Sequence, residues 1–202
     1  DARGERGLAI HYRALATVRA ARVQRETYPA YRPASGYRMV ASPTLYPGQV
    51  LRARLLADAA NARNVDTCLY VTYFGAEDAP VVARSEQVAL APGEETDLAW
   101  AVTVPTGCPI AWVGVEITST ERADGTVYLD WLTWDGAPSV RLGPPEHAGT
   151  RWLDAWVQAA SAVTADREHD LRVMQDEGVG LVLQGAREWQ DYRASARLTP
   201  HL

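Results

Sequence analysis

Three features of the sequence predict an all-β fold, an antiparallel β-sandwich. Short segments in which apolar and polar residues alternate recur along the chain, as expected for strands with one buried face. Pro, Gly and Asp residues separate these segments and favour turns. The length of 202 residues suits one large sandwich, or one domain and part of another, and a hydrophobic share of 47% suits a packed core.

Five strands are expected in the first part of the chain, at Leu8–Tyr12, Thr17–Gln24, Gly36–Ser42, Leu51–Leu55 and Cys68–Phe74. The fourth shows the pattern most clearly, because its leucines and alanine alternate with arginines that would face water. A turn at Tyr46-Pro47-Gly48 precedes it.

Three further strands are expected at Leu98–Val104, Ala111–Ile117 and Thr126–Trp134, after a turn at Ala91–Glu94. In the second of them, Ala111 and Val113 belong to the alternate residues that are expected to face the core, the inward set. A turn at Asp124-Gly125 leads into the third, whose two faces are both largely apolar, which favours a central strand. Seven or eight strands are therefore expected before Gly143, enough to complete a sandwich.

The remainder of the chain, residues 144–202, is expected to be a linker followed by a partial second sandwich unit, with residues 1–143 as the first domain. Gly143-Pro144-Pro145 marks the linker. Arg151–Val163 fits an amphipathic helix and an extended segment equally well. Gly180–Gln184 and Trp189–Leu198 are expected strands, which either open a second sandwich or pack back on the first one.

Composition and charge narrow the function. All 20 basic residues are Arg, which fits a GC-rich bacterial genome and excludes Schiff-base chemistry on Lys and a P-loop. A net charge of −5 argues against nucleic acid as a partner. No run of 18 apolar residues and no signal peptide is present, so we expect no membrane association and favour the cytoplasm.

Recognisable catalytic or metal-binding motifs are missing. The sequence contains no Gly-x-Ser-x-Gly elbow and no His-x-x-x-His pair. Cys68 and Cys108 fit no metal-ligand spacing, and whether they form a disulfide or remain separate buried thiols stays open. No catalytic residue is predicted.

An aromatic surface is the best candidate for a binding site. The chain has seven Trp and nine Tyr against one Phe, and Trp and Tyr combine a flat apolar ring with a polar group. Sugar rings stack on such rings. Trp112 lies opposite the inward set of its strand, whereas Trp131 and Trp134 occupy opposite faces of theirs. For each of these residues core packing is the alternative.

Asp124, Asp130 and Asp135 cluster around one expected strand. Calcium prefers carboxylate and carbonyl oxygens and often stabilises sandwiches, so Asp130 is the candidate ligand of a structural calcium ion. The alternative is an aspartate at the edge of the core, hydrogen-bonded to neighbouring backbone amides.

Several stretches resemble the region downstream of the catalytic domain in bacterial ADP-ribosylglycohydrolase-like proteins. They are Tyr37–Gln49, Asp124–Gly136, Gln175–Gly185 and Glu188–Arg193. In addition, Gly125, Tyr128 and Asp130 are similar to the Gly-x-x-Tyr-x-Asp pattern of galactose-binding-like jelly rolls, which include many carbohydrate-binding modules. The resemblance spans nearly the whole chain but carries no catalytic signature.

This resemblance implies a galactose-binding-like jelly roll that serves as a non-catalytic accessory module, covalently linked to a helical catalytic domain in the parent hydrolase. Its ligand would be a carbohydrate or an ADP-ribose-type molecule, with Trp112, Trp131 and Tyr128 supplying stacking and Arg54 a polar clamp. Two alternatives stay open: part of a hydrolase acting on ADP-ribosyl or glycosidic linkages, and a purely structural or oligomerisation domain.

Overall fold

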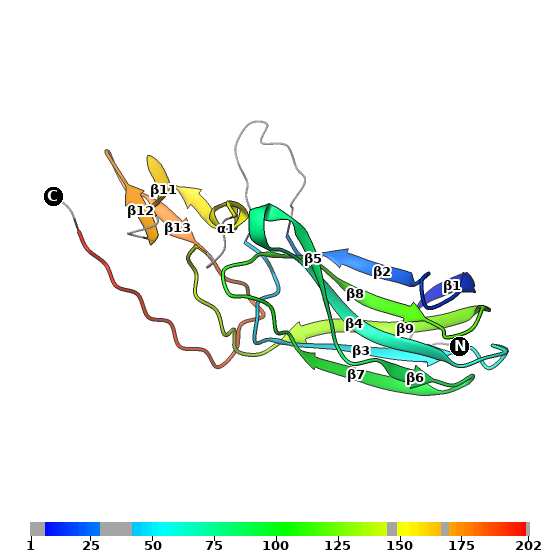
Figure 1. Ribbon diagram of the computed structural model, residues 1–202. Coiled ribbons are helices and arrows are strands. Elements are labelled where there is room, and N and C mark those ends of the chain that lie inside the picture. Colours follow the sequence, from blue (N-terminus) through cyan, green and yellow to red (C-terminus); the bar gives the residue numbers. More distant parts are fainter. Residues whose placement is uncertain (1–6, 29–41, 145–148, 167–169, 201–202) are drawn as a thin grey trace.

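The computed structural model describes residues 7–28, 42–144, 149–166 and 170–200. Two antiparallel sheets face each other and form a β-sandwich, so the all-β prediction is confirmed (Figure 1). In the described residues no helix is long and apolar enough to cross a membrane. The strand expected at Gly36–Ser42 falls almost wholly outside the described residues.

The first sheet has four strands in the order β1-β9-β3-β7. Their bounds are Leu8–Leu15 for β1, Ala123–Asp135 for β9, Val50–Ala57 for β3 and Glu95–Ala101 for β7. Strand β9 lies between two neighbours, as its apolar character predicted, and it begins before Asp124. The turn expected at Asp124-Gly125 was therefore wrong, because both residues lie within the strand.

The second sheet has five strands, with the order β2-β8-β4-β5 and with β6 also paired to β4. Their bounds are Ala21–Glu26 for β2, Ile110–Thr118 for β8, Val65–Phe74 for β4, Pro80–Arg84 for β5 and Val88–Leu90 for β6. A short 3₁₀ helix, η1 (Ala76–Asp78), connects β4 to β5. The described part before Gly143 thus contains nine strands.

The core lies between the inner faces of the two sheets. Leu51, Ala53 and Leu55 of β3 are fully buried and contact the same cluster as Val113 and Val115 of β8. Arg52 and Arg54 alternate with them on the outer face, as the period-two pattern predicted. Burial of this apolar set is the main source of the sandwich's stability.

Two β-bulges interrupt this alternation. In β9 the pairing with β3 shifts between Trp131, opposite Arg54, and Leu129, opposite Leu55, so that Asp130 is the extra residue. In β8 the pairing with β4 shifts so that Ala111 is extra. The prediction that Ala111 belongs to the inward set is wrong, because Ala111 packs in a separate cluster.

Beyond the sandwich, the chain forms one short helix and two small sheets at one end of the molecule (Figure 1). Helix α1 covers Arg151–Asp154, and the strands are β10 (Val157–Ala159), β11 (Ala162–Asp166), β12 (Asp170–Met174) and β13 (Leu181–Leu183). Strand β10 pairs with β13 and β11 with β12. Only one turn of the helix considered for Arg151–Val163 is present.

The strand expected at Trp189–Leu198 is not formed. In the structure this segment is extended and exposed but pairs with no strand of the described residues, apart from a single bridge between Gly136 and Trp189. Figure 1 shows it as the red tail that leads away from the sandwich. Its alternating pattern is that of a strand, but no described sheet edge lies beside it.

Several hydrogen bonds attach the C-terminal part to the sandwich, among them one from the Gly185 amide to the Tyr46 hydroxyl at 3.1 Å. Fully buried Gln49 donates from its side-chain amide to the backbone oxygens of Gly136, at 3.3 Å, and Glu188, at 3.1 Å. The carboxylate of Asp78 accepts hydrogen bonds from the backbone amides of Thr150 and Arg151, at the start of α1. These bonds hold the segments after residue 149 against the end of the sandwich.

Candidate functional site

Three of the four predicted ligand-binding residues lie on the outer face of the four-stranded sheet. Arg54 pairs with Trp131, and Tyr128 pairs with Leu56, two positions further along β3. In a regular strand, residues 128 and 131 would point to opposite faces. The bulge at Asp130 adds one residue between them and brings both rings to the same face.

Arg54 is held in place by the neighbouring strand β7. Its Nε donates to Asp97 Oδ1 at 2.7 Å and its Nη2 to Oδ2 at 2.9 Å, a two-pronged pair, while Glu95 lies 3.5 Å from Nε. The guanidinium also lies over the Trp131 ring, 5.7 Å from its centroid. The hydrogen bonds and charge of Asp97 raise the pKa of Arg54, and those from Arg54 lower the pKa of Asp97.

Tyr128 is fixed in a similar way. Its hydroxyl donates to Asp58 Oδ2 at 2.7 Å, which raises the pKa of Tyr128. The Asp58 carboxylate also accepts from the backbone amide of Ala60, and these two hydrogen bonds lower its pKa. The ring of Tyr128 is therefore oriented by a carboxylate at its polar end, while the residue remains half-buried.

We name this surface the bulge face and define it by Arg52, Arg54, Glu95, Asp97, Tyr128, Asp130, Trp131 and Asp135. It combines two aromatic rings with guanidinium donors and carboxylate acceptors. Arg52 pairs with Asp135 at the far end of β9, as Arg54 pairs with Asp97. Sequence analysis missed Glu95 and Asp97, because only the register of β7 against β3 places them beside Arg54.

Asp130 lies in the bulge itself and is half-buried, close enough for its charge to act on Arg54. A guanidinium is thus a close charged neighbour of the proposed calcium ligand. Among the described residues, no group of three or more His, Cys, Asp or Glu side chains could hold a metal ion. The calcium site at Asp130 stays a prediction.

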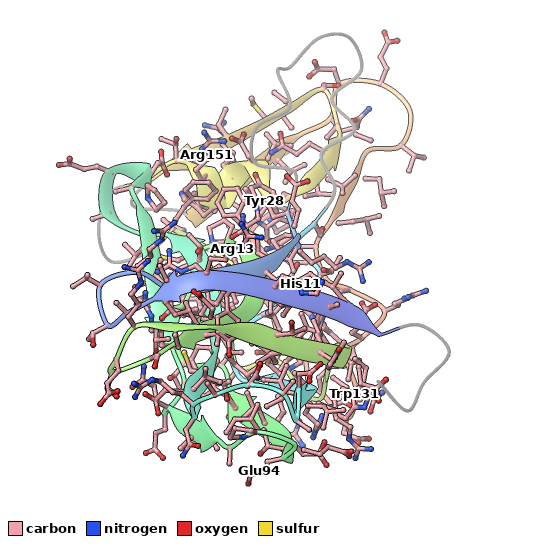
Figure 2. The ribbon with its side chains drawn as sticks, turned by 90° about the vertical axis from the view of Figure 1, so that its right-hand side faces the viewer. His11, Arg13, Tyr28, Glu94, Trp131 and Arg151 are labelled. Atoms are coloured by element: carbon pink, nitrogen blue, oxygen red, sulfur yellow. The ribbon has the colours of Figure 1, made fainter. Side chains whose placement is uncertain are left out.

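Trp112 is not part of the bulge face. It lies on the outer face of the five-stranded sheet, opposite Thr72, and packs half-buried against a cluster that includes Tyr28 and Phe74. Its ring centroid is 6.2 Å from that of Phe74. Figure 2 shows Tyr28 beside Arg151 near α1, whereas Trp131 lies well away from both. The structure therefore separates Trp112 from Trp131 and Tyr128.

A charged cluster that sequence analysis did not anticipate lies on the same sheet as Trp112. Glu116 is buried, and its carboxylate accepts from Arg22 Nε at 2.5 Å and from Arg84 Nε at 2.7 Å. Burial alone would raise the pKa of Glu116, but these two arginines outweigh it and the pKa is lowered. The two guanidinium groups cover Glu116 and link β2 and β5 to β8.

Both cysteines are free thiols and both are buried. Burial, together with the negative charge of Glu116, raises the pKa of the Cys68 thiol to about 11. Burial also raises the pKa of Cys108. Thiols with raised pKa values are poor nucleophiles at neutral pH, so both residues serve as packing groups.

Comparisons with protein-family models, with curated proteins and with solved structures found no match.

Proposed function

We propose that this chain is a non-catalytic accessory module that binds a saccharide on the bulge face. The observation that carries the proposal is the bulge at Asp130, which turns Tyr128 and Trp131 onto one face beside a clamped arginine. Without the bulge, the two rings would be on opposite sides of the sheet. A bulge that re-aims side chains toward one surface is typical of functional positions.

The chemistry of the bulge face suits a ligand with many hydroxyl groups. Aromatic rings offer a flat apolar surface for the C–H groups of a sugar ring. Arg54 and Arg52 donate hydrogen bonds, and Asp97 and Asp135 accept them, so donors and acceptors alternate across β7, β3 and β9. Because Arg52 and Arg54 are each paired with a carboxylate in advance, a neutral polyhydroxyl ligand could exchange hydrogen bonds with these two pairs.

The low pKa values of carboxyl groups on and beside the bulge face favour a binding role over a catalytic one. On and beside the bulge face, hydrogen bonds from Arg54 lower the pKa of Asp97, and hydrogen bonds from the Ala60 amide and from Tyr128 lower the pKa of Asp58. A general acid in glycoside hydrolysis needs the opposite, a pKa raised toward neutrality. This argues against the alternative in which the chain itself acts on glycosidic or ADP-ribosyl linkages.

The proposal that this module lies beside a helical hydrolase domain rests on the sequence resemblance to ADP-ribosylglycohydrolase-like proteins. In that setting the module would hold a glycan, or an ADP-ribose-type group, near the catalytic domain of the same polypeptide. The jelly-roll topology and galactose-binding-like ancestry belong to the same proposal, and the two-sheet architecture supports both.

The test is isothermal titration of the full chain with a panel of neutral oligosaccharides and with ADP-ribose. We expect one class of neutral saccharide to bind and Trp131→Ala to weaken it about tenfold or more, as for a central aromatic anchor. Tyr128→Phe keeps the ring but loses the orienting hydrogen bond to Asp58, and should weaken binding less than Tyr128→Ala does.

Arg13→Ala, at an exposed position of β1, is the control and should leave the affinity for the saccharide unchanged. Binding of ADP-ribose in preference to every oligosaccharide would assign the alternative ligand to this module. If no compound binds, or if Trp131→Ala binds like the natural chain, the bulge face is not a saccharide site. Hydrolysis of a substrate by the chain alone, with or without magnesium, would contradict the non-catalytic role.

A further inference from the structure

A groove lies at one edge of the sandwich, and it shares no lining residue with the bulge face. Strand β1 begins opposite Leu129, whereas β3 accompanies β9 as far as Asp135, so the last residues of β9 have a described partner strand on one side only. Inward-facing Leu132 and Trp134 therefore lie at an edge between the two sheets that no described strand covers. The segment after β13 closes this edge from the outside.

The result is a groove of about 810 Å³, which we name the edge groove. Its lining includes Arg25, Trp134, Gln184, Glu188, Trp189 and Tyr192. A volume of this size is in the range of small-molecule sites, roughly 300–1,000 Å³. Residues far apart in the sequence thus converge on one cavity, which is a common arrangement in binding sites.

Aromatic rings form one wall of the edge groove and are fixed by contacts with each other. Trp189 packs edge to face with Tyr46, at a centroid distance of 4.9 Å, and with Tyr192, at 5.2 Å. The backbone oxygen of Glu188, next to Trp189, accepts a hydrogen bond from buried Gln49. Tyr192 is 53% exposed, so much of its surface faces solvent. The wall is pre-organised and ends in an accessible aromatic ring.

A single uncompensated positive charge lies on the opposite side. Arg25, on β2, lies over the Trp134 ring at 5.8 Å from its centroid but forms no ion pair with the described residues. Arg22, three residues earlier on the same strand, is by contrast paired with Glu116. The other lining arginine, Arg187, is already paired with Glu188 at 2.8 Å. The charge balance of the groove therefore favours a ligand that brings one negative group.

The indole nitrogen of Trp189 adds a further polar feature. Its N–H is buried and has no acceptor among the described residues. Such unsatisfied buried donors are uncommon in folded proteins, and a polar group of a ligand is one partner that such a donor can take.

We propose that the edge groove binds a saccharide that carries one anionic group, with its ring against Tyr192 and its anion at Arg25. A carboxylate and a phosphate would both satisfy the guanidinium, because its planar donors match either group. The site uses no residue of the bulge face, so it stands or falls independently of the proposed function.

The test is a titration of the full chain, followed by tryptophan fluorescence and calorimetry, with glucuronate, glucose 6-phosphate and neutral maltotriose. We expect one or both anionic probes to bind more tightly than maltotriose, and added salt to weaken them. Arg25→Gln should lower the affinity for the anionic probe about tenfold, the loss of one charge-assisted hydrogen bond. Tyr192→Ala should weaken it as well.

Arg19→Gln makes the same charge change in the exposed turn before β2 and is the control, expected to bind like the natural chain. Binding of glucuronate alone identifies a sugar acid as the ligand, and binding of glucose 6-phosphate alone identifies a sugar phosphate. Equal affinity for all three probes, no binding, or equal effects of Arg25→Gln and Arg19→Gln would overturn the inference. So would loss of anion binding in Trp131→Ala, which belongs to the bulge face.

Discussion

Glu116 is the residue on which the outer layer of the five-stranded sheet most depends. Its buried carboxylate accepts hydrogen bonds from two arginines on different strands. Glu116→Ala leaves both guanidinium groups without their partner, and we expect it to lower the free energy of unfolding by about 2 kcal/mol, since the arginines are partly exposed. Glu86→Ala, on an exposed loop, should change it by less than about 0.5 kcal/mol in the same urea titration.

The pH dependence of this interaction has a definite sign. The folded-state pKa of Glu116 is lowered from the 4.5 of an ordinary glutamate, so the carboxylate's contribution is fully present above pH 4.5. It is lost as the pH falls through the lower, folded-state value. The difference in stability between the natural chain and Glu116→Gln should therefore shrink below pH 4.5. A difference that widens with acid would contradict the ion-pair account.

At the scale of elements, the bulge in β9 is the feature that assembles the bulge face. Deletion of Asp130 removes the extra residue and leaves Tyr128 opposite Leu56 and Trp131 opposite Arg54, so both rings should stay on the outer face in a regular strand. We expect the deletion to change the free energy of unfolding by less than about 1 kcal/mol, because Leu132 and Trp134 keep their partners on β3 and their core positions.

Asp130→Ala keeps the extra residue and is the matched control for that deletion. It should remain within about 0.5 kcal/mol of the natural chain, because the side chain is only half-buried. Both variants are compared by urea unfolding monitored by circular dichroism. A loss of about 3 kcal/mol or more on deletion, with Asp130→Ala unaffected, would contradict this register, because it would mean that Asp130 is not the extra residue.

The bulges also mark the limit of what the sequence could predict for the strands. Alternation correctly placed Leu51, Ala53 and Leu55 inside and Arg54 outside, because β3 is regular throughout. It failed for Ala111, where an extra residue shifts the pattern. No residue type requires a bulge at either position, so the arrangement of Trp131 and Tyr128 on one face follows only from pairing with β3.

The site was predictable to a similar extent. Arg54, Tyr128 and Trp131 were predicted from residue type, and the structure places them together. Trp112 was predicted from the same aromatic chemistry but lies on the other sheet, because strand order cannot be read from alternation. Asp97 was missed because its role depends on its register against Arg54.

At the scale of the whole molecule, the exposed apolar surface is concentrated in the C-terminal part. Of the eleven large hydrophobic side chains that are exposed among the described residues, seven lie between Val173 and Leu198. Sequence analysis expected a strand at Trp189–Leu198, and the pattern is present, but alternation cannot supply the neighbouring strand that a sheet requires. Local pattern and long-range pairing are separate conditions for β-structure.

The tail from Arg193 onward should therefore contribute little to stability. Residues 193–200 are exposed and form no hydrogen bond with other described residues, in contrast to Trp189. A chain ending at Tyr192 should unfold within about 0.5 kcal/mol of the full chain. Trp189→Ala should instead increase hydrogen exchange in residues 181–190, while the sandwich stays protected. A large loss of stability on truncation would contradict the exposed conformation.

The central claim is that one face of the four-stranded sheet, shaped by the bulge at Asp130, binds a saccharide. The most direct measurement is a ¹⁵N–¹H correlation spectrum of the full chain during titration with a binding oligosaccharide. The account predicts that the largest shifts occur at the Trp131 indole N–H and at the amides of Arg54, Asp97 and Tyr128. Shifts that cluster around Trp112 and Phe74, with the bulge face unchanged, would contradict it.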